Sequence, residues 1–132
     1  MKRFIVFLLV FFTLQGVHGS VNAQTAYGEV TSQPICFNLR SEAKNNVYGR
    51  VMTNYYEKAD GTVARHRSNF RLQPGASHEV CTSGPFFEGR KVEIVIQTFV
   101  PVFNCKTAIT GDIIFKDERN SEGTLKTWAE CL

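Results

Sequence analysis

Short runs of alternating apolar and polar residues, separated by Gly, Pro, Asn and Asp, fill the sequence from Cys36 to Leu132. Such alternation places one side of each run against a core and leaves the other side in water. The same region shows no internal repeat, no low-complexity tract and no helical periodicity. This pattern is typical of an all-β sandwich or a small barrel, and we predict a small antiparallel β-sandwich of about eight strands.

Two turn signals organise these runs. Asp60-Gly61 stands between two alternating runs and predicts a two-residue type I′ hairpin turn, because both residues tolerate positive φ. Pro74-Gly75 predicts a type II turn. The run 91–99 alternates regularly and is expected to be a central strand with one face in the core. The expected strands are 35–40, 47–56, 62–72, 77–81, 91–99, 105–109, 112–116 and 124–131.

Residues 1–23 have the order of features that defines a secretory signal peptide. A basic start precedes an apolar run over 4–14, and Val21-Asn22-Ala23 offers small residues for cleavage. The apolar run is about half as long as a membrane span requires. We therefore expect cleavage after Ala23, with a cut after Gly19 as the alternative, and a mature protein that is secreted or periplasmic and has no membrane span.

The charge balance changes when the signal peptide is removed. The full chain has 132 residues, with 15 Lys and Arg and 12 Asp and Glu. Loss of 23 residues, including Lys2 and Arg3, leaves 109 residues with 13 basic and 12 acidic side chains, a net charge of about +1. This balance argues against nucleic acid or a membrane surface recognised through bulk charge. We expect 24–34 to be a flexible lead-in and 35–132 to form one domain.

All four cysteines follow the signal peptide, at Cys36, Cys81, Cys105 and Cys131. An even number in an exported chain predicts two disulfides. The intervals of 45, 24 and 26 residues are unlike the closely spaced ligand pairs of zinc fingers and ribbons, so we expect no metal. Three pairings are possible. We favour Cys36 with Cys81 and Cys105 with Cys131, because each joins an early and a late strand of what look like two successive halves.

The predicted hairpin around Asp60-Gly61 gathers basic and aromatic residues on one face. A two-residue turn places Val51 opposite Phe70 and Tyr55 opposite His66 on the expected core side. The other face holds four arginines and two tyrosines: Tyr48, Arg50, Tyr56, Arg65, Arg67 and Arg71. A three-residue loop would slip one strand by one position and dissolve this cluster.

Arg50 opposite Arg71 is the informative pair in this register. Like charges directly opposite each other destabilise a sheet unless an anion neutralises them. A carboxylate of the chain itself could do this, and the candidates are Glu29, Glu42 and Glu88. A sulfate, phosphate, sugar acid or acidic protein could do the same as an external partner, because the planar guanidinium suits such groups.

The loop Gly84-Pro85-Phe86-Phe87-Glu88-Gly89-Arg90 is a second candidate surface. Two adjacent phenylalanines in a loop cannot both point the same way, so one can cap the core while the other is exposed. Burial of both around a bend is the alternative. We include Phe86 and Phe87 among the candidate contact residues.

Motifs that carry chemistry are almost absent. The sequence has no nucleophile elbow, no active-site cysteine signature, no histidine-rich zinc motif and no glycine-rich phosphate loop. His66 and His78, with Glu79 and a nearby arginine, have the residue types for acid–base cleavage of a phosphodiester, as in a small secreted ribonuclease-like hydrolase. The same residues lack the further ligands that a metal site needs, and we expect no cofactor.

The sequence therefore favours a non-enzymatic binding or accessory module, of envelope-associated, inhibitor or effector type, over an enzyme. Its expected partner is an anionic ligand or a protein, held by the face rich in arginine and tyrosine. The alternative is the small secreted hydrolase that uses His66 and His78. The two hypotheses differ in the residues whose replacement would abolish function.

Overall fold

The computed structural model describes residues 23–97 and 102–132. The predicted signal peptide, apart from Ala23, and the end of the predicted strand 91–99 lie outside the described residues. Within the described part of the chain, no helix is long and apolar enough to cross a membrane.

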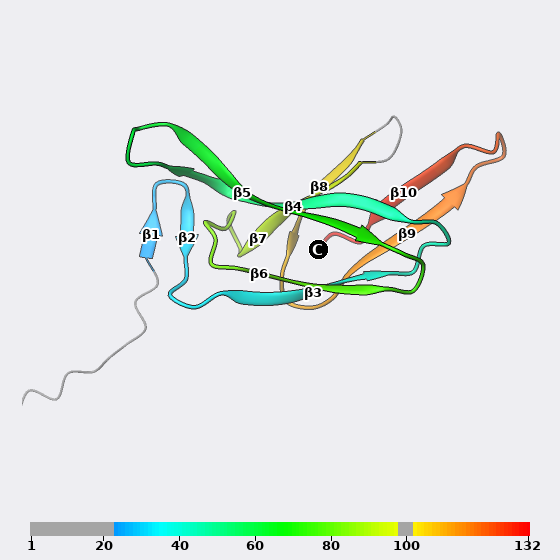
Figure 1. Cartoon of the computed structure of the whole chain (residues 1–132), viewed down its shortest axis with the longest axis horizontal. Coiled ribbons are helices and arrows are strands. Elements are labelled where there is room, and N and C mark those ends of the chain that lie inside the picture. Colours follow the sequence, from blue (N-terminus) through cyan, green and yellow to red (C-terminus); the bar gives the residue numbers. More distant parts are fainter. Residues whose placement is uncertain (1–22, 98–101) are drawn as a thin grey trace, which may run out of the picture.

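All eight strands predicted for the domain 35–132 are present, with ends shifted by a few residues. They form two sheets, ordered β10-β9-β3-β6 and β5-β4-β7-β8. Figure 1 shows β4 and β5 above β3 and β6. All pairings in these sheets are antiparallel except that of β3 with β9, so the predicted antiparallel sandwich is confirmed. The strands are β3 (Ile35–Ser41), β4 (Val47–Glu57), β5 (Val63–Leu72), β6 (Ser77–Thr82), β7 (Lys91–Ile96), β8 (Phe103–Ala108), β9 (Ile113–Arg119) and β10 (Leu125–Ala129).

The hydrophobic core lies between the inner faces of the two sheets. The strand β7 is central in its sheet, and its alternate residues Val92, Ile94 and Ile96 are fully buried, as the alternation predicts. Phe70 of β5 and Phe115 of β9 pack with ring centroids 5.0 Å apart across the core. The period of two in the sequence thus determines which side chains the core receives.

Both disulfides have the pairing that the sequence favours. Cys36–Cys81 joins β3 to its neighbour β6, and Cys105–Cys131 joins β8 to the segment after β10 in the other sheet. Each closes a long loop and contributes about 2 to 4 kcal/mol, in large part by restricting the unfolded chain. Disulfides persist in oxidising compartments, so the two bonds indicate an extracellular-type environment.

The segment 24–34 is structured, which corrects the prediction of a flexible lead-in. A small hairpin forms from β1 (Ala23–Thr25) and β2 (Gly28–Val30), and Phe86 N donates a hydrogen bond to Glu29 O at 2.9 Å. Gly28 and Gly84 permit this approach, because a Cβ at either position would overlap a backbone oxygen of the facing segment. The partner segment lies far away in the sequence, so the polar composition of 24–34 gave no sign of the pairing.

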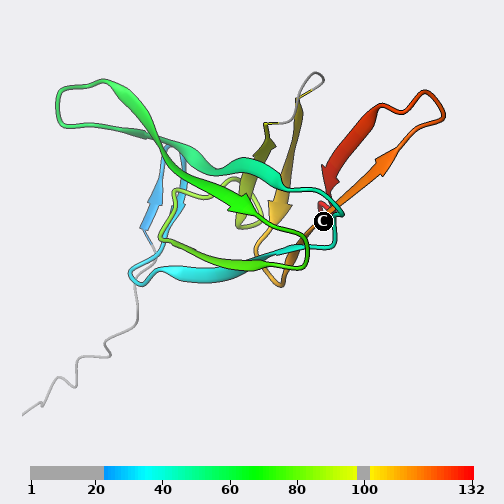
Figure 2. The same ribbon diagram turned by 45° about the vertical axis from the view of Figure 1, so that its right-hand side comes forward.

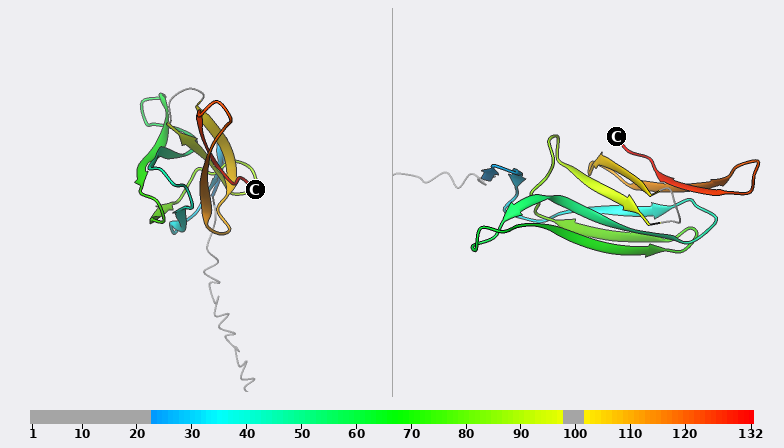
Figure 3. Two further views of the ribbon diagram at one scale, coloured as in Figure 1. Left: turned by 90° about the vertical axis from the view of Figure 1, so that its right-hand side faces the viewer. Right: turned by 90° about the horizontal axis from the view of Figure 1, so that it is seen from above.

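The turns differ in how well the sequence predicts them. Pro74-Gly75 forms the expected turn, with Ala76 N donating to Gln73 O at 3.0 Å and Gly75 at φ 75°. The β4–β5 and β9–β10 turns lie at opposite ends of the long axis in Figure 1 and Figure 3. Figure 2 shows the β9–β10 hairpin projecting from the body of the sandwich.

The β4–β5 turn has a three-residue loop, and the predicted two-residue type I′ turn is wrong. Gly61 N donates to Lys58 O, and Lys58 N donates to Thr62 O. Gly61 is the residue of this loop with positive φ, at 83°, while Asp60 is not left-handed. A type I turn followed by a left-handed glycine is the usual form of a three-residue hairpin loop.

A bulge between Met52 and Tyr55 shifts the β4–β5 register a second time. The loop and the bulge each displace the pairing by one position, so Arg50 faces Asn69 instead of Arg71. The predicted opposition of Arg50 and Arg71 is therefore wrong.

Candidate functional site

The outer surface of β4 and β5 carries the arginines that the sequence predicts to cluster. The two register shifts add to two positions, an even number, so the arginines of both strands keep the same face. The register pairs on this face are Tyr48 with Arg71, Arg50 with Asn69, Met52 with Arg67 and Tyr55 with Arg65. We call the side chains of Tyr48, Arg50, Tyr55, Arg65, Arg67 and Arg71 the arginine face.

The bulge exchanges two tyrosines between the faces of β4. Tyr55 is 44% exposed, and its ring centroid lies 4.7 Å from Cζ of Arg65. Tyr56 pairs with Ala64 on the inner side and stacks on His66, with ring centroids 4.5 Å apart. A bulge adds one residue and reverses the alternation beyond it. Tyr56 is therefore wrongly predicted as a member of the face, and Tyr55, expected in the core, takes its place.

Arg65 is the arginine of this face that the chain itself neutralises. Its Nη2 lies 2.5 Å from Oε2 of Glu93 on β7, and its Nε donates to Thr53 O at 2.8 Å. The Arg65 side chain is only 10% exposed, so this ion pair is a structural link across β4. The sequence reasoning missed Glu93, and the carboxylates it named do not pair with the arginine face: Glu29, Glu42 and Glu88.

Arg50, Arg67 and Arg71 have no carboxylate within ion-pair distance among residues 23–97 and 102–132. All 12 Asp and Glu of the chain lie in these two ranges, so the sequence holds no other acid for them. Nε of Arg50 is buried and has no hydrogen-bond partner in the described part of the chain. Three positive charges therefore share one face of the sheet without an internal counter-ion.

The two phenylalanines of the loop before β7 have different environments. Phe86 is 1% exposed and belongs to the core, so its inclusion among the contact residues is wrong. Phe87 is partly exposed beside the arginine face, with its ring centroid 4.3 Å from Nζ of Lys106 and 5.5 Å from Cζ of Arg65. Lys106 is on β8, where it pairs with Glu93 of the neighbouring strand β7, and it extends the basic surface. The sequence reasoning did not include Lys106 in this surface.

Glu29, a predicted counter-ion of the arginine face, pairs instead with Arg90. Nε and Nη2 of Arg90 donate to the two carboxylate oxygens at 2.9 and 2.7 Å. This hydrogen bonding lowers the pKa of Glu29 below its ordinary value. The pair attaches the β1–β2 hairpin to the loop before β7.

A cleft lies between β5 and β6, which are edge strands of the two different sheets. Its volume is about 360 Å³, and its lining includes Val51, His66, Ser68 and Val80. A second pocket of about 460 Å³ shares His66 with it and extends to Tyr56. The lining of the first cleft is mixed, with apolar side chains and hydroxyl groups along the inner side of β5, and it also includes Arg67 of the arginine face.

The two histidines of the hydrolase hypothesis do not line a common pocket. His66 lines both pockets, next to Ser83, and His78 lines neither. On β6, the lining residue nearest to His78 is Val80, two residues further along the strand at about 7 Å. Glu79 points to the opposite face of β6 from His78, because adjacent residues of a strand alternate. Among the described residues, His66 and His78 are therefore not brought together in either of these pockets.

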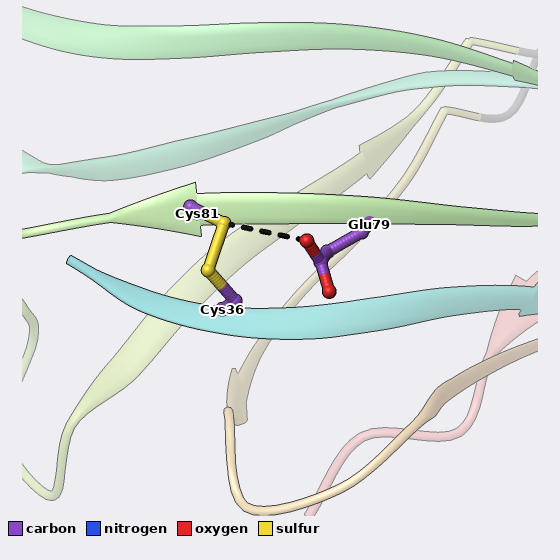
Figure 4. Close-up of side chains that lie close together, drawn as sticks. All are labelled: Cys36, Glu79 and Cys81. Atoms are coloured by element: carbon purple, nitrogen blue, oxygen red, sulfur yellow. Dashed lines mark hydrogen bonds between the residues drawn. A yellow bond between two sulfur atoms is a disulfide. The ribbon is translucent and has the colours of Figure 1, made fainter.

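Cys36, Glu79 and Cys81 form a cluster with the spacing of metal ligands, but its chemistry does not suit a metal. Figure 4 shows the disulfide between β3 and β6 with Glu79 beside it, and Oε1 of Glu79 lies 3.8 Å from Sγ of Cys81. Metals bind thiolate sulfur, which an oxidised pair does not provide. The disulfide sulfur carries no hydrogen, so this approach is a contact and not a hydrogen bond.

Comparison with known proteins assigns no family. No family model matches the chain, and no curated protein matches it. Among solved structures it is similar to the cytotoxin suilysin from Streptococcus suis, with a TM-score of 0.41 and 12% identity over 79% of this chain. It is also similar to a structure described as "Trapped Toxin", with a TM-score of 0.37 and 7% identity over 79% of this chain. This chain spans 24% of each of those chains, and likeness at this level carries no functional argument.

Proposed function

We propose that this protein is an exported, non-enzymatic binding module that holds a polyanionic partner on its arginine face. The observation that carries the proposal is that Arg50, Arg67 and Arg71 share one sheet face and have no carboxylate of the described residues within ion-pair distance. Export rests on the predicted signal peptide and accords with the two disulfides.

The spacing of the charges indicates several anionic groups on the partner. Arg67 and Arg71 are four residues apart on β5, about 13 Å along the strand. Arg50 lies between them on the neighbouring strand, opposite Asn69. A single small anion cannot reach groups so far apart. A partner with oxyanions repeated along its length can neutralise each guanidinium separately, through charge-assisted hydrogen bonds.

The tyrosines add contact area to the same surface. Tyr48 is 42% exposed, and its ring centroid lies 5.3 Å from Cζ of Arg71. Tyr55 is 44% exposed at the other end of the face. Tyrosine and arginine are the residue types enriched in protein interfaces, because they present rigid or planar surface together with a polar group.

The first test removes two charges from the arginine face and measures retention on polyanion columns. Arg50→Gln with Arg71→Gln removes both charges and keeps polar side chains, and immobilised poly-glutamate and a sulfated polysaccharide serve as probes. We expect the wild type to be retained and the double variant to bind about tenfold more weakly, with a smaller salt dependence.

The matched control is Arg119→Gln with Lys126→Gln, which removes the same charge from the β9–β10 hairpin of the other sheet. The control variant should elute like the wild type. Equal loss of retention in both double variants would show that bulk charge, and not the arginine face, holds the probe.

A further inference from the structure

The arginine face lies partly on an edge strand. β5 is ten residues long and is the terminal strand of its sheet, with β4 as its neighbour. Its second edge pairs with no other strand in the described part of the chain. Such an edge presents backbone N–H and C=O groups that can pair with an added strand.

We propose that this edge of β5 receives an extended acidic segment of a partner protein as an additional strand. The proposal rests on the proposed function and names the class of polyanion as a polypeptide. Strand addition takes affinity from backbone hydrogen bonds and selectivity from pockets that accept alternate side chains. β5 offers both kinds of contact along one edge.

The two sides of β5 explain which segment would fit. Side chains on the outer side of an added strand would lie beside Arg67 and Arg71, within about 5 Å between Cβ atoms for direct pairs, and acidic residues suit them. Side chains on the inner side would lie over the cleft that His66, Ser68 and Val80 line, and small apolar residues suit it. The preferred segment therefore alternates acidic and apolar residues.

Charge distinguishes β5 from other edges and other occupants. β6 is also an edge strand, but it carries Glu79, which repels an acidic segment. The edge strands β8 and β10 carry one lysine each, Lys106 and Lys126, whereas β5 carries three arginines. Pairing of β5 with β5 of a second copy would bring arginines against arginines, which destabilises a sheet. A sulfated polysaccharide can neutralise the arginines, but it has no regular peptide backbone to bond the edge. An acidic polypeptide can do both: its carboxylates neutralise the arginines, and its backbone bonds the unpaired N–H and C=O groups of the β5 edge.

The test uses capped fluorescent peptides of ten residues, the length of β5. In the first peptide Glu and Val alternate. The second peptide has the same composition, but its residues are arranged as Glu-Glu and Val-Val pairs, so the alternation is lost. The third peptide is the alternating one with N-methyl groups on every second amide, so that these amides cannot donate hydrogen bonds to β5. We expect the alternating peptide to bind about tenfold more tightly than either other peptide in fluorescence anisotropy. Alternate amides of residues 63–72 should gain protection from hydrogen exchange when it binds.

A variant of the protein tests the cleft separately. Ser68→Phe places a large side chain in the cleft, so it should weaken the alternating peptide about tenfold while leaving retention on poly-glutamate unchanged. Circular dichroism and the β5 amide protection of the unliganded variant report whether it folds.

The possible results separate this inference from the proposed function. Equal binding of all three peptides, without new protection in β5, would overturn strand addition and leave the polyanion-binding function standing. Binding of the sulfated polysaccharide alone would do the same. Failure of every polyanion to bind would overturn both proposals.

Discussion

The outer faces of the two sheets both carry basic residues, but they differ in how many of these residues pair with a carboxylate. On the β10-β9-β3-β6 sheet, Arg40 pairs with Glu42 at 3.3 Å and Asp112 at 3.5 Å, and Lys116 pairs with Glu42 and Glu130. We call this the paired face. On the arginine face, Glu93 is the carboxylate that pairs with an arginine among the described residues, and it pairs with Arg65.

Stability does not explain the difference between the faces. Exposed ion pairs such as those of Arg40 and Lys116 contribute little, typically less than about 1 kcal/mol each. Their main effect is to cancel charge, so the paired face attracts neither anions nor cations strongly. Carboxylates beside Arg50, Arg67 and Arg71 would have cancelled the charge of the arginine face with little effect on stability, but these three arginines have none in the described part of the chain. This uncompensated charge is the observation on which the proposed external partner rests.

The largest expected effect comes from Glu93→Gln, which removes the carboxylate that pairs with Arg65. Arg65 is 10% exposed and would lose its charged partner, so we expect the free energy of unfolding to fall by about 2 to 3 kcal/mol. The same change raises the charge of the face, so retention on poly-glutamate should increase. Urea denaturation and salt elution measure the two effects.

Opposite signs for stability and binding are the informative outcome of Glu93→Gln. Glu118→Gln makes the same change of charge at an exposed position of β9 and serves as the control. Weaker retention of the Glu93 variant, measured where it is fully folded, would contradict the proposed role of the arginine face.

A smaller effect is expected from Asp117→Asn, on the sheet that bears the paired face. Asp117 accepts hydrogen bonds from Lys44 N at 2.8 Å and Asn45 N at 3.0 Å, and from Nδ2 of Asn45 at 2.7 Å. These bonds hold the loop that leads from β3 in one sheet to β4 in the other. Replacement by Asn removes charge-assisted acceptance, and we expect a loss of about 1 kcal/mol after solvent screening.

The pH dependence of this contribution has a definite sign. Partial burial alone would raise the pKa of Asp117, but the hydrogen bonds from Lys44 and Asn45 outweigh it and lower the pKa below its ordinary value. A carboxylate with a lowered pKa stabilises the fold above its unfolded pKa, and this contribution disappears as the pH falls through the folded pKa. The wild type should therefore lose its advantage over the Asn variant in acid. If the difference in free energy of unfolding between the wild type and Asp117→Asn stays constant from neutral pH down to the acid range in which Asp117 is protonated, this account is wrong.

Local pattern predicts the sandwich well because each strand needs only an alternation and a turn at each end. The run of Val92, Ile94 and Ile96 determines its buried face by itself, and Pro74-Gly75 determines its turn. The disulfide pairing follows from the order of the strands. The β1–β2 hairpin could not be predicted in this way, because it depends on Phe86 and other residues far away in the sequence.

The arginine face was predicted with the correct arginines and the wrong neighbours. Its arginines keep a common face because the loop at Gly61 and the bulge after Met52 shift the register by two positions in total. A bulge depends on how β4 bends between β5 and β7, which no short pattern in β4 encodes. The same limit applies to Glu93, since its meeting with Arg65 depends on the sheet order.

The smallest expected change in stability comes from Glu42→Gln on the paired face, and this variant also compares the two faces most directly. Glu42 lies between Arg40 and Lys116 at 3.3 and 3.8 Å, and all three side chains are about 40% exposed. Its loss should change the free energy of unfolding by less than about 1 kcal/mol.

Glu42→Gln and Glu93→Gln each add one positive charge to the protein, but on opposite outer faces. Arg40 keeps Asp112 and Lys116 keeps Glu130 after Glu42 is replaced, so the paired face still carries its own anions. Retention on poly-glutamate should therefore stay at the wild-type level for Glu42→Gln and rise for Glu93→Gln. If both variants bind the column more tightly by the same amount, the column responds to net charge, and the asymmetry between the two faces has no part in binding.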